Sequence, residues 1–181
     1  MSIAELAAFK KYISNINAYF EFGVGGSTVF VHENTNAQIM GVDSSSKWIE
    51  QVSKHADYRV NLMFIDIGPV GDWGMPKNEQ KKENWPQYSA SINTVDSKPD
   101  VILVDGRFRV ACLIQTILYS TKNNLDPIIL LHDCNRNDYN PGKEVLTCLD
   151  QVGTLAAFKL NNKYQLEDLE LLYHKFKYIL E

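Results

Sequence analysis

Two short apolar runs place the strongest constraint on the fold of this chain. "VILV" at 101–104 and "IILL" at 128–131 have the length of a strand, and each is followed directly by polar residues. Such unbroken apolar runs are typical of parallel strands that are buried on both faces. Because a helical pattern at 109–121 lies between them, the sequence predicts a strand–helix–strand unit with a right-handed crossover.

The alternation of strands and helices extends over the whole chain. Strand patterns occur at 17–23, 36–43, 58–67, 101–104, 128–131 and 153–160. Helical patterns occur at 3–13, 25–34, 47–56, 109–121, 142–152 and 166–180. We therefore expect an α/β fold in one domain over residues 1–181, a Rossmann-like three-layer αβα sandwich with a mostly parallel sheet of six to seven strands.

A long connection, residues 68–98, joins the third and fourth predicted strands. It holds three of the six prolines and two of the three tryptophans. Connections of this length inside a compact domain are usually functional or disordered, and this composition favours a lid with a short helix within 84–92. Trp73, Trp85 and Tyr88 are suited either to stacking on a ligand ring or to holding the connection against the core.

Acidic residues recur where the predicted strands end. Those at the tips of five successive strands are Glu21, Asp43, Asp66, Asp105 and Asp133. In a parallel α/β sheet these tips lie on one edge, and the ligand crevice lies beyond it. A single carboxylate there is often only a helix cap, whereas five together predict a binding site.

The segment "EFGVGGST" contains a glycine loop, residues 23–26. Gly23, Gly25 and the later Asp43 fit a dinucleotide-binding loop, but Thr28 replaces the third glycine of that motif. Glu21 is also a poor neighbour for a pyrophosphate. S-adenosylmethionine is the other ligand that uses such a loop, and its cationic amino group and ribose diol suit nearby carboxylates. These residues leave both ligand classes open.

The order of the motifs adds a resemblance to a known family. "EFGVGGST" resembles motif I of the class I S-adenosylmethionine-dependent methyltransferases, "GVDSS" their second-strand acid, and "FIDIG" their third-strand acid. "DIGPVGDWGMP", "VDGRFRVAC" and "LLHDCNR" resemble a small group of methyltransferase-like proteins of largely undetermined substrate. The resemblance covers nearly the whole chain and implies S-adenosylmethionine as the cofactor.

The resemblance also implies roles for individual cofactor-binding residues. Glu21 would face the amino end of the cofactor, Asp43 both ribose hydroxyls, and Asp66 the adenine amine. Gly23 and Gly25 would admit the cofactor to the backbone, and Ile67 would pack on the adenine, with Ser27 and Ser44 as further contacts. From the residues alone, Asp43 is also a possible helix cap and Asp66 a turn residue.

The ends of the fourth and fifth strands carry the candidate catalytic residues. Asp105 and Asp133 are expected close together, where they can share a proton, orient a hydroxyl, or hold Mg²⁺ with Asn135. His132 is a candidate general base, the alternative being a histidine hydrogen-bonded to a neighbouring loop. The resemblance to metal-dependent catechol methyltransferases is incomplete, because Cys134 follows Asp133.

Two arginines, Arg107 and Arg109, stand at the start of the helix that follows Asp105. They either pair with the nearby carboxylates or bind a carboxylate or phosphate of the acceptor. With Trp85 they form the expected acceptor site. We expect O-methylation of a small polar or glycan-like acceptor. The rival hypotheses are an NAD(P)- or nucleotide-binding Rossmann protein and a non-catalytic scaffold.

Composition excludes several other classes of protein. The net charge of −4 and the pI near 5.6 argue against a nucleic-acid partner. Three cysteines without a C-x-x-C pair fit a reducing compartment. Because neither a secretory signal nor an apolar run of membrane-spanning length is present, we expect a cytoplasmic protein without a membrane partner. The apolar face of the last helix suits a homodimer.

Overall fold

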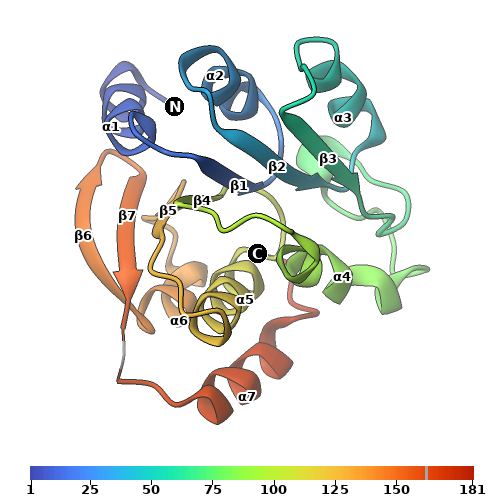
Figure 1. Ribbon diagram of the computed structural model, residues 1–181. Coiled ribbons are helices and arrows are strands. Elements are labelled where there is room, and N and C mark those ends of the chain that lie inside the picture. The colour runs from blue at the N-terminus through green and yellow to red at the C-terminus, as the bar shows by residue number, and fades with distance from the viewer. Residues whose placement is uncertain (162) are drawn as a thin grey trace.

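The computed structural model describes residues 1–161 and 163–181. In this part of the chain a seven-stranded sheet has the order β3-β2-β1-β4-β5-β7-β6 (Figure 1). Strands β1 to β5 pair in parallel, whereas β7 is antiparallel to both β5 and β6. The strands are β1 (Ala18–Phe22), β2 (Gln38–Asp43), β3 (Val60–Phe64), β4 (Val101–Val104), β5 (Ile128–Leu131), β6 (Leu146–Val152) and β7 (Leu155–Leu160).

Helices cover both faces of the sheet. In Figure 1, α1, α2 and α3 lie on one side of the sheet, and α4, α5 and α7 lie on the other. The helices are α1 (Ile3–Ile13), α2 (Gly26–Asn34), α3 (Ser46–Ser53), α4 (Trp85–Ala90), α5 (Arg109–Lys122), α6 (Asn140–Lys143) and α7 (Leu166–Phe176). The expected Rossmann-like αβα sandwich with a mostly parallel sheet is confirmed.

The middle strands β4 and β5 are buried on both faces, which explains their unbroken apolar sequence. Successive residues of β4 enter different cores: Ile102 packs in the cluster that contains Ile114 of α5, and Leu103 packs in the cluster that contains Phe9 of α1. The loops after these strands therefore start from a rigid base.

The prediction of a helix at 142–152 is wrong. Only α6, which ends at Lys143, is helical there, and β6 continues as an edge strand with most of its residues exposed. Gly153 and Thr154 form the turn that returns the chain as β7, with φ of +60° at Gly153. An edge strand that packs only weakly has no strong alternation of apolar residues, so its sequence did not show its conformation.

The 68–98 connection contains the expected short helix, α4, together with the 3-10 helices η1 (Asp72–Gly74), η2 (Lys82–Asn84) and η3 (Ser91–Thr94). The 3-10 helix η4 (Asn137–Tyr139) lies elsewhere, ahead of α6. Trp85 and Tyr88 on α4 are buried against Phe108, with ring centroids 5.5 and 5.8 Å from it. They hold this part of the connection against the core, whereas Trp73 is 84% exposed.

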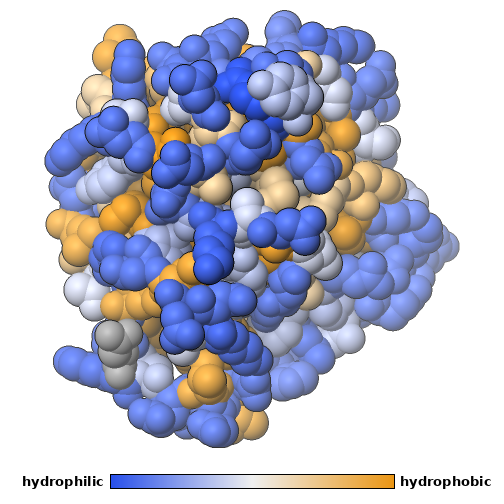
Figure 2. Space-filling view, in the orientation of Figure 1, coloured by the Kyte–Doolittle hydropathy of each residue, from blue (hydrophilic) through white to orange (hydrophobic). Residues whose placement is uncertain are grey.

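Polar side chains cover most of the face seen in Figure 2, with apolar residues between them in smaller patches. Such a mixture is ordinary for a protein surface. In the part of the chain that the structure describes, no helix has both the length and the apolar character needed to cross a membrane.

Candidate functional site

A cavity of about 850 Å³ lies beyond the carboxyl ends of the parallel strands. Its walls are the loops after β1, β2, β4 and β5, with Met1 and Leu6 at one side and Trp73 and Gly74 at another. The expected site residues that line it are Gly23, Gly25, Ser27, Asp43, Ser44, Asp105, Arg107, Arg109, His132 and Asp133. The cavity is within the range of about 300–1,000 Å³ that is usual for ligand sites.

Gly23 and Gly25 serve different purposes in the glycine loop. Gly23 has φ of +92°, and a Cβ there would lie 2.6 Å from backbone atoms of Gly106. The loops after β1 and β4 can therefore touch only because Gly23 has no side chain. A Cβ on Gly25 would have no other protein atom within 4 Å. Gly25 thus leaves bare backbone at the start of α2, with room for a ligand.

The side chain of Glu21 lies beneath the glycine loop and does not line the cavity. It is fully buried, accepts a hydrogen bond of 2.7 Å from the hydroxyl of Tyr19, and accepts another from Thr28. Thr28 Oγ1 accepts from the backbone N–H of Gly25 at 2.9 Å. Burial raises the pKa of Glu21 to about 7. The contact of Glu21 with the amino end of the cofactor stays a prediction. In this structure the side chain points with Tyr19 toward the α1 and α2 face and supports the loop from below.

Asp43 lies at the cavity beside the glycine loop. Its carboxylate accepts from the backbone N–H of Val24 at 3.1 Å and from that of Ser45 at 2.7 Å. Burial raises the pKa of Asp43 to about 6, although these two N–H groups favour the charged form. The cap of α3 is Ser45, whose hydroxyl accepts from Trp48 N. Asp43 is therefore not required as the helix cap.

The residues expected around the adenine and the acceptor include three that lie away from the cavity. Asp66 pairs with Lys81 and accepts from the N–H of Gly68 at 3.1 Å, as a turn residue does. Ile67 is fully buried, and its carbonyl accepts from the indole N–H of Trp85 at 3.1 Å. Trp85 is thus a core residue and not a residue of the cavity wall, because α4 packs it inward.

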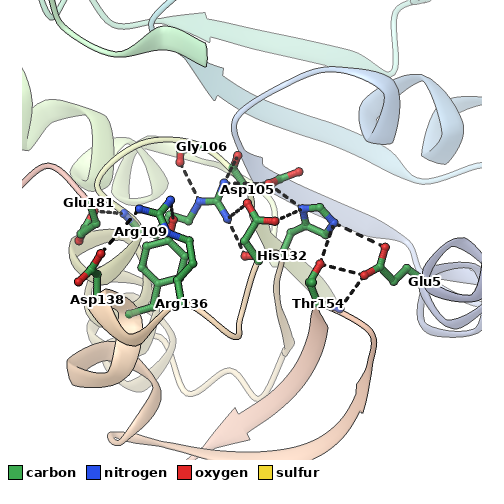
Figure 3. Close-up of polar contacts among 11 residues, drawn as sticks. Glu5, Asp105, Gly106, Arg109, His132, Arg136, Asp138, Thr154 and Glu181 are labelled. Carbon is green, nitrogen blue, oxygen red and sulfur yellow. Dashed lines mark hydrogen bonds and ion pairs between the residues drawn. The ribbon is translucent and has the colours of Figure 1, made fainter. Parts of the chain in front are cut away.

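Asp105, His132 and Asp133 form what we call the acid–histidine cluster (Figure 3). His132 Nδ1 lies 3.3 Å from Asp105 Oδ1 and 3.5 Å from Asp133 Oδ1. The hydrogen bond with Asp105 raises the pKa of His132, against the effect of burial. Asn135, which was expected to join these acids around a metal, is exposed and does not line the cavity.

Arg109 binds both carboxylates of the cluster. Its Nη2 lies 3.1 Å from Asp105 Oδ1, and its Nη1 lies 3.1 Å from Asp133 Oδ2. Of the two alternatives considered for Arg109, pairing with the acids is the observed one. Arg107 also lines the cavity, and its Nε is buried with no hydrogen-bond partner among the described residues.

Two residues that the sequence did not point to, Glu5 and Thr154, contact His132 from its other side. His132 Nε2 lies 3.5 Å from Thr154 Oγ1 and 3.8 Å from Glu5 Oε2. Glu5 accepts from the N–H and the hydroxyl of Thr154 and from the N–H of Ser2, which lowers its pKa to about 2. The S-x-x-E spacing of Ser2 and Glu5 is a capping-box signal that was available in the sequence. Nothing local pointed to Thr154.

A glycine loop after β1 and acids after β2, β4 and β5 all line one cavity of a mostly parallel sheet. A solved structure of a methyltransferase-like protein from Silicibacter pomeroyi matches 98% of this chain and 95% of its own, with a TM-score of 0.84 and 29% identity. The resemblance seen in the sequence is confirmed.

More distant structures share the fold. The StiE O-MT matches 94% of this chain and 78% of its own at 11% identity, with a TM-score of 0.52. The MycE methyltransferase from the mycinamycin biosynthetic pathway, solved with Mg and SAH, matches 91% of this chain and 50% of its own at 14% identity, with a TM-score of 0.51. No family model matches the chain. No curated protein matches it either.

Proposed function

We propose that this protein binds S-adenosylmethionine and methylates a hydroxyl oxygen of a small polar or glycan-like acceptor. The observation that carries the proposal is that one cavity joins Gly25 and Asp43 to Asp105, His132 and Asp133. A ligand site and a set of groups that can accept a proton therefore line the same cavity. The methyltransferase fold supports the same proposal.

The residues on the β1 and β2 side of the cavity fit this cofactor. The open backbone at Gly25 is a cradle that a side chain would fill. Asp43 beside it is placed to accept hydrogen bonds from a ribose diol, and Ser27 and Ser44 are further polar contacts of the lining. Glu21 holds the loop in shape through Thr28. When bound, the cofactor supplies an electrophilic methyl group on a sulfonium.

The β4 and β5 side handles the proton of the acceptor. Asp105 and Asp133 are 28% and 41% exposed and line the cavity. A hydroxyl bound there donates its hydrogen bond to one of these carboxylates, and the cluster takes up the proton as the oxygen becomes methylated. His132, hydrogen-bonded to Asp105, shares in holding that proton. The proposal contains no Mg²⁺ step, because Arg109 already binds both carboxylates.

The acceptor side of the cavity offers one cation and one aromatic surface. No ion pair joins Arg107 to an acid among the described residues, so its guanidinium is available for a carboxylate or phosphate of the acceptor. Trp73 is exposed at the cavity wall and offers a face for a sugar ring. The cation favours an acceptor with a negative charge, and the aromatic face favours one with a sugar ring.

Calorimetric titration with S-adenosylmethionine, S-adenosylhomocysteine and NAD tests the cofactor class. We expect the first two to bind with micromolar dissociation constants and NAD not to bind. Asp43→Asn is expected to weaken binding by about 10- to 100-fold, because a hydrogen bond to a charged group contributes about 1.5–3 kcal/mol. Binding of NAD alone would identify a dinucleotide-binding protein instead.

The matched control is Asp126→Asn. Asp126 precedes β5, pairs with Lys159 and lies at the opposite edge of the sheet, so this variant should bind as the wild type does. Turnover is tested with methyl-labelled cofactor and a polar metabolite extract separated by charge. We expect label in the anionic fraction and none with Asp105→Asn/Asp133→Asn. Tight cofactor binding without label in any fraction would identify a non-catalytic scaffold.

A further inference from the structure

We infer that Arg109 is the resident cation of the acid–histidine cluster, and that it stands where a divalent metal would otherwise bind. The cluster then orients its carboxylates without a metal ion. This goes beyond the proposed function, because it concerns the charge balance of the cluster and does not depend on which cofactor the cavity holds. Arg109 is in this sense a positioning residue and does not itself contact the acceptor.

The donor set alone would suit a divalent ion. One ligand atom from each of Asp105, His132 and Asp133 lies within 4.8 Å of the others. Two carboxylates and an imidazole are reasonable ligands for Mn²⁺ or Zn²⁺, whereas Mg²⁺ prefers oxygen ligands throughout. The set expected for Mg²⁺ included Asn135, which is exposed and does not line the cavity. The residues present therefore fit Mg²⁺ poorly.

The guanidinium of Arg109 occupies the position between the two acids. It contacts Asp105 Oδ1 and Asp133 Oδ2 at 3.1 Å each, and the side chain is only 4% exposed. A divalent ion bound by the same oxygens would lie next to a buried positive charge, where the repulsion is weakly screened. For a metal to bind, Arg109 would have to move away.

Further contacts hold Arg109 in place. Its Nη1 donates to the carbonyl of His132 at 2.6 Å and its Nε to the carbonyl of Gly106 at 3.0 Å. The guanidinium lies over the ring of Tyr139, with its carbon 5.2 Å from the ring centroid. Because these groups belong to the loops after β4 and β5 and to η4, the arginine also ties these two loops together.

The chain offsets an unfavourable position for this cation. Arg109 is the first residue of α5, where the helix dipole disfavours positive charge. The side chain of Glu181 lies across this helix end and accepts from the backbone N–H of Arg109 and of Val110, at 3.0 Å each. The helix start therefore does not explain why a cation stands at this position. The two carboxylates that Arg109 binds do explain it.

Mn²⁺ is the probe that tests this inference. In the wild type, titration to about 1 mM Mn²⁺ should show no binding in calorimetry and no selective broadening of the His132 ring signals in proton spectra. Arg109→Met should leave two carboxylates and an imidazole without their cation. It should then bind Mn²⁺ at least about tenfold more tightly, as loss of a neighbouring positive charge requires, and broaden the His132 signals.

Two variants control the test. Arg109→Met/Asp133→Asn should lose the gained affinity, because a ligand is removed. Arg136→Met removes another cation of the cavity lining, one that contacts Tyr139 and Asp138 instead of the cluster, and should behave as the wild type does. Should Arg109→Met not fold, Arg109→Gln takes its place, since its amide keeps donors for the carbonyls.

Two results would overturn the inference. One is micromolar Mn²⁺ binding by the wild type with broadening of the His132 signals. The other is a folded Arg109 variant that gains no affinity for Mn²⁺. A titration of the same samples with S-adenosylhomocysteine separates this result from the proposed function, because cofactor binding at Gly25 and Asp43 is expected whether or not the cluster takes a metal.

Discussion

The two sides of the cavity differ in the partners of their carboxylates. On the β1 and β2 side, Asp43 accepts from the backbone N–H groups of Val24 and Ser45, and a side chain at Gly25 would have free space. On the β4 and β5 side, Asp105, His132 and Asp133 contact one another and Arg109. The first side therefore has free space beside Gly25, whereas the carboxylates of the second side are already paired with a cation.

This difference suits the two tasks of a group-transfer enzyme. A cofactor site gains affinity when the ligand satisfies groups that the empty protein leaves open. A site for chemistry gains rate when its charges are oriented before the acceptor arrives. Substitutions on the first side should therefore change mainly ligand affinity, and substitutions beneath the second side should change mainly stability. The predictions below test that division.

The largest effect is expected for Gly23→Ala. Gly23 lies on the β1 and β2 side of the cavity, but its role is to let two loops pack together and not to bind a ligand. A Cβ would lie 2.6 Å from the backbone of Gly106, at a φ of +92° that alanine rarely adopts. We expect a loss of at least about 3 kcal/mol in the free energy of unfolding, as for other severe backbone clashes. Urea unfolding followed by circular dichroism measures it.

Gly25→Ala is the matched variant for this comparison. Its backbone is extended, and the added Cβ meets no protein atom within 4 Å. Stability should change by less than about 0.5 kcal/mol, as at an unconstrained surface site, while affinity for S-adenosylhomocysteine falls. Equal stability of the two alanine variants would contradict the distinction between Gly23, which is needed for packing, and Gly25, which leaves room for a ligand.

The next largest effect is expected for Glu5→Gln. Glu5 lies beneath the β4 and β5 side of the cavity, where it contacts His132 and Thr154. The carboxylate accepts from Ser2 and twice from Thr154, and these donors lower its pKa to about 2. Loss of the charge should destabilise the protein by about 2 kcal/mol, the usual contribution of hydrogen bonds to a charged group. Urea unfolding at neutral pH measures it.

The sign of the pH dependence gives this prediction a second test. A carboxyl with a lowered folded pKa stabilises above its ordinary value of 4.5, and the stabilisation is lost as the pH falls toward about 2. The difference between wild type and Glu5→Gln should therefore shrink over this range. Glu33→Gln, at an exposed site on α2, serves as the control. A difference independent of pH would show that the charge of Glu5 is not responsible.

Local patterns were sufficient to predict six of the seven strands and the position of the glycine loop and Asp43 at the strand ends. The apolar runs of β4 and β5 are local, and so are the glycine loop and its spacing from Asp43. Each follows from residues close in sequence, whose conformation depends mainly on their own period and on backbone freedom. Strand alternation also gave the correct edge of the sheet for Asp105, His132 and Asp133.

The contacts of Glu5 and Thr154 with His132 could not be predicted in this way, whereas the pairing of Arg109 with Asp105 and Asp133 was one of two alternatives. Glu5 and Thr154 are joined across 149 positions of the chain, and Arg109 reaches the carbonyl of His132 across 23. The hairpin of β6 and β7 that carries Thr154 was expected to begin with a helix. The family resemblance placed Glu21 at the cofactor, whereas the sequence did not show to which face of the sheet its side chain points.

A smaller effect is expected from pH on the ligand side. Asp43 has a pKa raised from 3.8 to about 6, so over this range the folded protein holds a proton that the unfolded chain has released. Ribose hydroxyls bind the ionised carboxylate. Affinity for S-adenosylhomocysteine should therefore fall about tenfold per pH unit below pH 6, which is about 1.4 kcal/mol per unit, in titrations from pH 7 to 5.

The pH dependence of stability at Asp43 is opposite to that of ligand affinity. A raised carboxyl pKa means that the free energy of unfolding falls as the pH rises from about 4 to about 6, since the buried charge is then formed. Asp43→Asn should remove both pH dependences together. Affinity that stays constant between pH 7 and 5 in the wild type would mean that Asp43 does not hold the ligand in its ionised form.

The smallest effect is expected for Asp66→Asn, and it is informative because two accounts of this residue differ. The family resemblance gives Asp66 the adenine amine, whereas in the structure it pairs with Lys81 and caps the turn at Gly68, outside the cavity lining. We expect affinity for S-adenosylhomocysteine to change by less than about twofold, since the substitution removes only an exposed ion pair and a turn contact away from the cavity. A tenfold loss of affinity in calorimetry, at unchanged stability, would mean that Asp66 does contact the cofactor. The ligand-binding side of the cavity would then extend to the end of β3.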